Sequence, residues 1–591
     1  MARVAGAGAV ILLSISCSGQ TATSTATPSP SPSPSPIAYG PPQYRALWVD
    51  AFHDGIKSPA QVEKLVADAH RGNINALFVQ VRKAGDAYFN RSDEPRAADI
   101  KGPIDFDPLA YVIRLAHAAV PRIEVHAWLN TFFAGESSKV YLEHGDAWGN
   151  RAADGSASGY LDPGVPEVQV YTHRVFMDVA KNYDVDGLHM DFVRYPGSSW
   201  GYSPVSVLLF MLETGARVAP AAGDEGWKAW RRERVTAFVR DLHDDLKSEN
   251  PNVKLSGALI CFGSGPLTAA DWSKTAAYGS VFQDWNTWLA KGYVDFGVPM
   301  NYDSDWSGLE KQWFDRWQNF EKDSGFADRI VTGVGAFLNY PEGTLGQIRR
   351  AVAPSSRGNR VLGVAIYSYG STSVYGTDDF YGSPDLASGL PRQPYSGGIK
   401  DRASLAGRAR TFNDWFMTQL SQPDYYHDVE YGWVATVPVF TQPALVPVLP
   451  SSRRCFSGAA DQVPPASKLL RLLGFAVPAA LTLAGVQPVM GAATGSLTAF
   501  WAVQLSAPTI AAAAVLFMAA RRFDRGDGAQ PPWYAAWVLF PGAFLLAGAA
   551  SMCIIGALVD LPVVAPTLWA LVALGSVTWA GAFVLVGRAS H

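Results

Sequence analysis

The chain has 591 residues, which is too long for one hydrophobic core, so we expect two to four structural units. Its formal net charge of −4 gives no electrostatic case for nucleic-acid binding. The four cysteines lie far apart and lack zinc-ligand spacing, so neither a disulfide framework nor a cysteine zinc site is predicted.

The N-terminal segment has the composition of an export signal. Residues 1–17, MARVAGAGAVILLSISC, combine one Arg with an apolar run and small residues before Cys17. This pattern is similar to a bacterial lipoprotein signal, in which the cysteine is lipidated; an ordinary signal or an uncleaved anchor is the alternative. Residues 18–40 are rich in Ser, Thr and Pro and predict an extended linker. Together they predict a domain held outside the cytoplasm.

Residues 41–425 alternate between apolar strand-like runs and segments with helical periodicity. The strand-like runs are RALWVDAF (45–52), NALFVQVR (75–82), RIEVHAWLN (122–130), VDGLHMDF (185–192), VKLSGALI (253–260), VDFGVPMNY (294–302), RIVTGVGAF (329–337) and VLGVAIYSYG (361–370). Strands that alternate with helices pair in parallel. We therefore predict an α/β fold, a (β/α)8 TIM-type barrel. A doubly wound open sheet is the alternative, although no GxGxxG follows the first run.

Side chains on a strand alternate between its two faces. If the uniformly apolar positions face the helices, the remaining positions point into the barrel. The predicted inward positions are Trp48, Asp50, Gln80, Arg82, His126, Trp128, Asn130, Gly187, His189, Asp191, Pro299, Asn301, Asp303, Tyr367 and Tyr369. Several of them lie at the C-terminal ends of their strands, where barrel enzymes build their sites.

At these residues the chain resembles a known family, the bacterial glycosyl-hydrolase-like 10 proteins. The matching segments run in order from about Tyr44 to Gly370: RALWVDAF, VQVRKAGDAYF, EVHAWLN, YLDPGVPEVQ, DVDGLHMDFVRYPG, QDWNTWLAKGYVDFGVPMNY and GVAIYSYG. The resemblance implies a (β/α)8 barrel that hydrolyses a glycan in the cell envelope, with peptidoglycan glycan strands as one candidate. The chain departs from the family where its third strand ends in Asn-Thr-Phe-Phe rather than Asn-Pro-Tyr-Arg.

Glycoside hydrolysis usually needs two carboxyl groups on either side of the bond. Asp191, at the end of the fourth strand-like run, is the first predicted catalytic residue; a structural carboxylate held by Arg82 or Arg194 is the alternative. No Glu ends any predicted strand, so the second predicted catalytic residue is Asp303, with a turn or helix-cap role as the alternative. Weaker candidates are Asp50 and Asp86.

Amide, guanidinium and aromatic side chains bind sugar hydroxyls and ring faces. The predicted substrate-binding residues are Arg82, Asp86, His126, Trp128, Asn130, His189, Arg194, Tyr195, Asn301, Tyr302 and Tyr369. A polar network that braces the barrel, or ordinary core packing, is the alternative for each. Residues 193–226 form a long segment that we expect to cover the substrate.

Three histidines, His53, His126 and His189, raise the question of a zinc site. No HxH or HExxH motif is present, and strand counting places the three at different depths. Buried core histidines are therefore favoured, and we predict no cofactor and no metal.

The C-terminal region, residues 468–591, contains four long apolar stretches after a Pro-rich connector at 426–467. Each stretch is about long enough to cross a ~30 Å hydrocarbon layer, so about four transmembrane helices are predicted. Positive residues near the tail would place the connector in the cytoplasm, which conflicts with an exported barrel. A proline-broken fifth span at 432–452, a tail that breaks the charge rule, or a tail foreign to this reading frame are the open explanations.

The expected protein is an exported glycoside hydrolase attached to the cell membrane, with its catalytic domain outside the cytoplasm. Its expected partners are membrane lipid and a cell-envelope or extracellular polysaccharide. A non-catalytic glycan receptor with a membrane domain is one alternative. A metal-dependent carbohydrate hydrolase or deacetylase is the other.

Overall fold

The computed structural model describes residues 37–339, 341–372, 412–428 and 432–450. The predicted signal at 1–17, nearly all of the linker and the predicted transmembrane helices at 468–591 lie outside these residues. Within the described part of the chain, no helix has both the length and the apolar character needed to cross a membrane.

Eight parallel strands form a closed barrel, in which the last strand pairs with the first. The barrel strands are β1 (Tyr44–Val49), β2 (Ala76–Arg82), β3 (Glu124–Asn130), β6 (Gly187–Asp191), β7 (Lys254–Ile260), β8 (Phe296–Asn301), β9 (Val331–Gly335) and β10 (Gly363–Tyr367). Each strand falls within one of the predicted runs or overlaps it, in the predicted order. The predicted (β/α)8 barrel is confirmed, and the open-sheet alternative is wrong.

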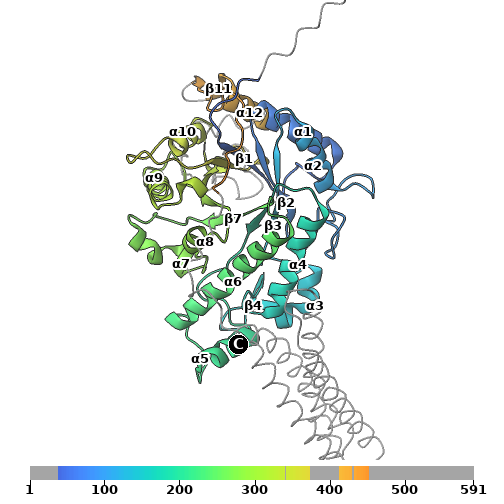
Figure 1. Cartoon of the computed structure of the whole chain (residues 1–591), viewed down its shortest axis with the longest axis vertical. Coiled ribbons are helices and arrows are strands. Elements are labelled where there is room, and N and C mark those ends of the chain that lie inside the picture. The colour runs from blue at the N-terminus through green and yellow to red at the C-terminus, as the bar shows by residue number, and fades with distance from the viewer. Residues whose placement is uncertain (1–36, 340, 373–411, 429–431, 451–591) are drawn as a thin grey trace, which may run out of the picture.

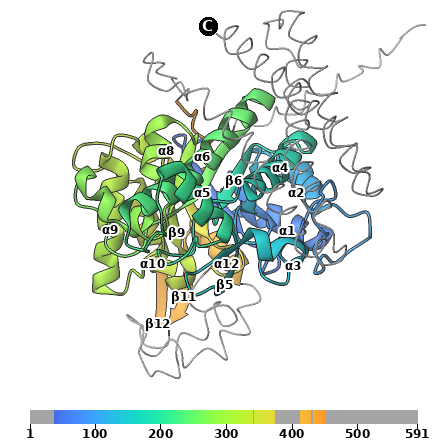
Figure 2. The same ribbon diagram turned by 90° about the horizontal axis from the view of Figure 1, so that it is seen from below.

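Helices surround the barrel, with α9 and α10 on one flank and α1 to α4 on the other (Figures 1 and 2). The helices are α1 (Pro59–Arg71), α2 (Pro108–Ala118), α3 (Lys139–Trp148), α4 (Pro166–Asn182), α5 (Pro204–Thr214), α6 (Glu225–Glu249), α7 (Ala276–Gly279), α8 (Trp285–Lys291), α9 (Gly308–Asp323), α10 (Pro341–Val352) and α12 (Phe412–Ser421). Short 3-10 turns are η1 (Ala269–Lys274), η2 (Ala327–Arg329) and η3 (Ala336–Leu338). Ser58 and Asp107 each cap the helix that follows with a side-chain oxygen, and a proline comes next, which explains why α1 and α2 begin there.

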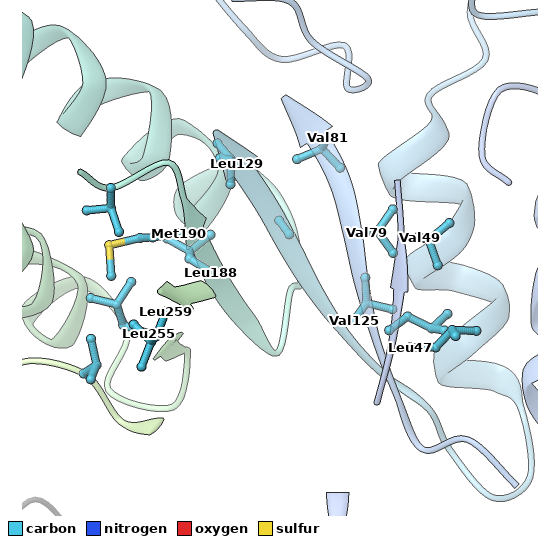
Figure 3. Packing of buried hydrophobic residues seen from close by; sticks show 14 of the residues in the cluster. Leu47, Val49, Val79, Val81, Val125, Leu129, Leu188, Met190, Leu255 and Leu259 are labelled. Atoms are coloured by element: carbon cyan, nitrogen blue, oxygen red, sulfur yellow. The ribbon is translucent and has the colours of Figure 1, made fainter. Parts of the chain in front are cut away.

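The barrel strands bury side chains on both of their faces, one set toward the helices and one set inside the barrel. Leu47, Val49, Leu188 and Met190 leave the strands toward the helices and join the main hydrophobic core (Figure 3). The apolar side chains that fill the interior are Tyr44, Ala46, Trp48, Ala76, Phe78, Trp128, Phe296, Val298, Val331 and Ala365. A barrel interior of this kind is a packed core and no pore. A substrate therefore has room only above these layers, at the mouth that the loops after the strands form.

The loops after β3 and β6 carry extra structure at the mouth. The chain after β3 inserts α3 and an antiparallel hairpin of β4 (Gly149–Arg151) and β5 (Ala157–Leu161), and the chain after β6 inserts α5. In Figure 1, α5 and β4 lie at the lower end of the molecule, while α12 and β11 lie at the upper end. The mouth therefore faces the lower end in this view.

The opposite end of the barrel, its base, is closed by the chain that follows α12. Strands β11 (Asp424–Asp428) and β12 (Gly432–Thr436) pair antiparallel. The backbone N–H of Gly40 then donates to the carbonyl oxygen of Pro443, and Val446 and Leu449 pack against the interior cluster. Part of the predicted connector thus seals the base. Because residues 432–436 form a strand and the described residues after them form no helix, the proposed fifth span is wrong.

Candidate active site

Asp191 is the last residue of β6, so its carboxyl lies at the barrel mouth. The residue pairs in register with Asn130 at the end of β3, and the backbone N–H of Thr131 donates to its carbonyl oxygen at 2.7 Å. The Oδ1 atom of Asp191 accepts the backbone N–H of Phe192, also at 2.7 Å. Backbone groups therefore hold both the strand end and the carboxyl.

The surroundings of Asp191 change its acidity. Burial raises the pKa of Asp191 to about 6, because an ionised carboxylate loses solvation there. The Arg194 guanidinium, the Phe192 N–H and the Trp128 indole oppose this rise only in part. A carboxyl with a pKa near 6 is populated in both protonation states around neutral pH, which suits a general acid.

Four aromatic rings, here called the aromatic floor, line the bottom of the mouth: Trp48, Trp128, Tyr302 and Tyr367. The ring centroids of Tyr302 and Tyr367 are 5.3 Å apart, and each of these tyrosines lies 6.0 Å from Trp48. Trp128 contacts Tyr367 at 6.3 Å and also borders Asp191. Gly335 on β9 permits this packing, because a Cβ there would lie 3.1 Å from the Cβ of Tyr302. Trp48 and Trp128 are themselves buried, so the exposed part of the floor is formed by the half-buried Tyr302 and Tyr367.

Three further rings, here called the aromatic wall, stand above the rim next to Asp191: Phe133, Tyr160 and Phe192. Their centroids lie 5.3 to 5.9 Å from one another. The Arg194 guanidinium lies 5.1 Å from the Phe192 ring centroid. The charge on Asp191 contributes to the pKa of Tyr160, which burial raises to about 12. Tyr160 of the wall therefore lies close enough to Asp191 to interact with its charge.

The second predicted catalytic residue, Asp303, follows β8 and is also buried. Burial raises the pKa of Asp303 to about 7, and the like charge of Glu310 adds to the rise. Its Oδ2 atom has no hydrogen-bond partner among the described residues. The charge of Asp303 does not contribute to the pKa of Asp191, nor that of Asp191 to the pKa of Asp303. The structure therefore gives no sign that the two carboxyls interact directly. Asp303 as the second catalytic group stays a prediction.

Arg82 and Asn130 form part of a polar brace below the rim. Arg82 is fully buried, donates to both carboxylate oxygens of Glu94 at 2.7 to 2.9 Å and donates to the carbonyl oxygen of Asn130. The Asn130 amide donates to the Lys83 carbonyl oxygen at 2.6 Å. Asp86 accepts the backbone N–H groups of Lys83 and Ala84 and so closes the turn after β2. These contacts match the bracing alternative more closely than substrate binding.

His126 and His189 lie inside the barrel, below the floor. His189 accepts the indole N–H of Trp48 at 3.0 Å, contacts the Ser256 hydroxyl at 2.9 Å and stacks on Phe78. Burial lowers the pKa of His189 well below its usual value, so its ring is neutral. His126 contacts Glu124 at 3.1 Å, near the base. In the part of the chain that the structure describes, no three His, Cys, Asp or Glu side chains are grouped closely enough to hold a metal ion.

Like His126 and His189, three further predicted substrate ligands do not face the mouth. Asn301 donates to the carbonyl oxygen of Phe314 on α9, so its predicted inward orientation is wrong; Phe296 and Val298 take the inward positions of β8 instead. Tyr369 is also turned outward, because its hydroxyl donates to Asp68 on α1 at 2.8 Å.

Tyr195 is the third of these residues. It is fully buried, and its hydroxyl donates to Asp162 at 3.3 Å. It holds the loop that follows Asp191 in place and has no surface exposed to a ligand.

The structure also adds residues that the predicted site lacked. The predicted residues that it does gather at the mouth are Asp191, Trp128, Arg194 and Tyr302. The wall was not predicted, although Phe192 directly follows Asp191 and Tyr160 lies in the family-like segment YLDPG. Trp48 and Tyr367 were predicted to point inward, and their ring contacts confirm it, but the sequence alone did not connect them to the site.

Comparison with known proteins identifies relatives of the barrel. Residues 43–333 match the family model described as "Glycosyl hydrolase-like 10". Glycosyl hydrolase YngK of Bacillus subtilis (strain 168) is 26% identical over 272 residues, which cover 40% of this chain and 48% of the relative. Glycosyl hydrolase DigH of Escherichia coli (strain K12) is 26% identical over 275 residues, which cover 42% of this chain and 58% of that relative. The chain thus spans about half the length of the curated relatives it matches.

Solved structures also align with the chain. The glycoside hydrolase domain of PgaB (BpsB) from Bordetella bronchiseptica aligns with a TM-score of 0.42 and 14% identity, over 55% of this chain and 94% of that domain. The α-L-fucosidase isoenzyme 2 of Paenibacillus thiaminolyticus aligns with a TM-score of 0.39 and 14% identity, over 55% of this chain and 45% of that enzyme.

Proposed function

We propose that the chain hydrolyses O-glycosidic bonds, with Asp191 as the general acid, because its residues 43–333 match the glycosyl hydrolase-like 10 family model. One observation carries the proposal. Asp191 is a buried carboxyl at the C-terminal end of a barrel strand, with a pKa raised to about 6, beside aromatic rings of a size that suits a sugar. Barrel enzymes place their catalytic groups at this end of the strands.

In the proposed reaction, protonated Asp191 donates its proton to the oxygen of the leaving sugar as the bond from that oxygen to the anomeric carbon breaks. The oxygen of a water molecule ends on the anomeric carbon, and the remaining proton of that water returns to the medium through a base. Asp303 is the predicted second carboxyl, either as that base or as a nucleophile. The aromatic floor would support the apolar face of the sugar that is being cleaved.

The finer proposal concerns substrate and location. We infer a cell-envelope or extracellular polysaccharide, with peptidoglycan glycan strands as one candidate, cleaved outside the cytoplasm by a protein attached to membrane lipid. Support comes from the signal-like residues 1–17 and the apolar stretches in residues 468–591. The aromatic rings and the arginine at the mouth agree with a glycan substrate.

The test is digestion of purified peptidoglycan and common polysaccharides by the full-length chain, with product masses as the readout. We expect released sugar fragments from at least one of them, and a loss of rate of about 10²-fold or more in Asp191→Asn. Asp184→Asn, a solvent-exposed change in the loop before β6, is the matched control and should keep full activity. No fragment from any polysaccharide would contradict the proposal, and activity abolished by a chelator would favour a metal-dependent hydrolase or deacetylase.

A glycan receptor without catalysis is the second candidate. The observation that favours it is that Asp191 has no second carboxyl among its electrostatic neighbours in the described part of the chain. A receptor should bind oligosaccharides equally well as wild type and as Asp191→Asn, and it should release no product from either.

A further inference from the structure

The aromatic wall is held together by three separate chain segments. Phe133 follows β3, Tyr160 belongs to β5, and Phe192 follows β6. An isolated bridge joins Phe133 to Tyr160, and the backbone N–H of Phe132 donates to the carbonyl oxygen of Phe192 at 3.4 Å. The hairpin insertion after β3 thus brings an aromatic ring against the residue next to Asp191.

The backbone at Phe192 has an unusual conformation. Its φ is 48°, in the left-handed region that side chains other than glycine seldom adopt. Such conformations persist when the surrounding structure holds them, and they are concentrated at functional sites. Here the strained backbone holds a half-buried ring at the position directly after the candidate acid.

The position of the carboxyl relative to the two aromatic groups defines two places for sugar rings. Trp128 of the floor belongs to the barrel interior and Tyr160 of the wall to the main core outside it, and both neighbour Asp191. Phe133 and Phe192 are half-buried: they pack against the main core, and the remaining part of each side chain is exposed to solvent. Arg194, which lies against Phe192, supplies donors for the hydroxyls of a sugar bound there.

We propose that Phe133 and Phe192, with the buried Tyr160 packed against both rings, form a binding subsite for the leaving sugar, while the aromatic floor holds the sugar whose bond breaks. This inference rests on the proposed function and deepens it. It assigns the substrate class as a chain of at least two sugar units that continues past the scissile bond, rather than a sugar attached to a small non-sugar group. The aromatic wall would therefore make the protein bind longer oligosaccharides more tightly than shorter ones.

The first test measures binding without turnover. The full-length protein with Asp191→Asn is titrated with the monosaccharide N-acetylglucosamine, which is too short to fill both subsites, and with peptidoglycan glycan strands freed of peptides, separated from the disaccharide to the octasaccharide. We expect affinity to rise as the oligosaccharide becomes long enough to reach the wall. Adding Phe133→Ala should lower the affinity for the longer oligosaccharides about tenfold. It should leave the affinity for the shortest ligand unchanged. Val120→Ala, an exposed apolar residue between α2 and β3 at the base, is the control.

The second variant separates the ring from the fold. Phe192→Gly removes the ring but fits the left-handed backbone better than Phe, so the protein should fold with an unchanged or higher melting temperature. It should still lose the affinity gain for long oligosaccharides, and Phe192→Tyr should restore it. Equal binding of long oligosaccharides by the parent and by Phe192→Gly would overturn the inference, as would an absence of any chain-length effect in the parent.

Turnover measurements distinguish this inference from the proposed function. Products from wild-type protein with no effect of Phe133→Ala on KM or product lengths would overturn the wall subsite alone. Chain-length binding that depends on the wall, without any product from wild type, would overturn the proposed hydrolysis and leave a glycan receptor that uses the wall.

Discussion

At the scale of single residues, the charge beside Asp191 determines when the candidate acid is protonated. Burial raises its pKa to about 6 and the Arg194 guanidinium limits that rise. If Asp191 is the general acid, kcat/KM falls as the pH rises through about 6, because the free enzyme loses the proton that it must donate.

Arg194→Gln provides the first prediction. Without the guanidinium the ionised form of Asp191 is less favourable, so its pKa rises and the alkaline limb of the kcat/KM profile moves to higher pH. The measurement is the pH dependence of glycan-strand hydrolysis. Arg217→Gln, which removes the same charge from an exposed position after α5, should leave the limb in place. A shift to lower pH would contradict the role assigned to Arg194.

The side-chain directions predicted from strand alternation are correct for some residues and wrong for others. Alternation along the strands correctly placed Trp48, Trp128 and Tyr367 inside the barrel. It failed on β8, where apolar Phe296 and Val298 fill the interior, because a packed barrel core is apolar on both faces of its strands. Tyr369 follows the strand end, where the chain turns and alternation no longer applies.

At the scale of elements, α9 and β9 are joined by a buried carboxyl. Glu321 on α9 accepts the hydroxyl of Thr332 at 2.6 Å and the amide of Gln318 at 2.7 Å. Burial nevertheless raises the pKa of Glu321 to about 8, from an ordinary value of 4.5. The folded state therefore favours the protonated form. The stability that this form supplies is fully present below pH 4.5 and is lost as the pH rises through about 8.

Glu321→Gln tests this description of the packing between α9 and β9. The variant keeps the shape but carries no charge, so its melting temperature should be close to that of wild type at pH 5 and higher at pH 9. Thermal unfolding at the two pH values is the measurement. The exposed Glu143→Gln on α3 should show no such difference. A variant that is less stable than wild type at pH 9 would show that the ionised carboxylate is preferred.

Sequence patterns predicted the elements more reliably than their contacts. Apolar runs separated by helical periodicity gave all eight barrel strands, because each strand must bury its outer face against a helix. The hairpin of β4 and β5 was not predicted, since strands of three and five residues are too short to show a clear alternation of apolar and polar positions. The wall depends on that hairpin, which explains why it was missed.

At the scale of the whole molecule, an ionic network joins three strands of the barrel at its base. Lys254 on β7 donates to both Glu124 oxygens at 2.6 and 2.8 Å, and the Tyr44 hydroxyl and His126 also contact that carboxylate. Burial opposes ionisation, but the His126 and Lys254 contacts outweigh it and lower the pKa of Glu124 to about 2. Its stabilising contribution is therefore present above pH 4.5 and is lost as the pH falls toward 2.

Glu124→Gln should destabilise the protein by about 3 kcal/mol at pH 7, because Lys254 loses its partner at a mostly buried position. Denaturant unfolding monitored by circular dichroism measures the change. The loss should shrink as the pH is lowered toward 2, where wild-type Glu124 is itself protonated. Glu249→Gln, which removes one half of an exposed pair with Lys181, should cost little. A pH-independent loss would argue against the ionised network.

The sealing of the base has a consequence for how this protein can be presented to its substrate. The described chain begins at residue 37 and, after its last gap, ends at residue 450, and both stretches run along the same closed end through the contact of Gly40 with Pro443. If one of the two flanking segments attached the barrel to a surface, as we propose, it would leave the barrel on the side away from Asp191. A short tether at that end would direct the barrel mouth away from the surface, and the proposed hydrolysis could then reach long glycan chains that do not diffuse.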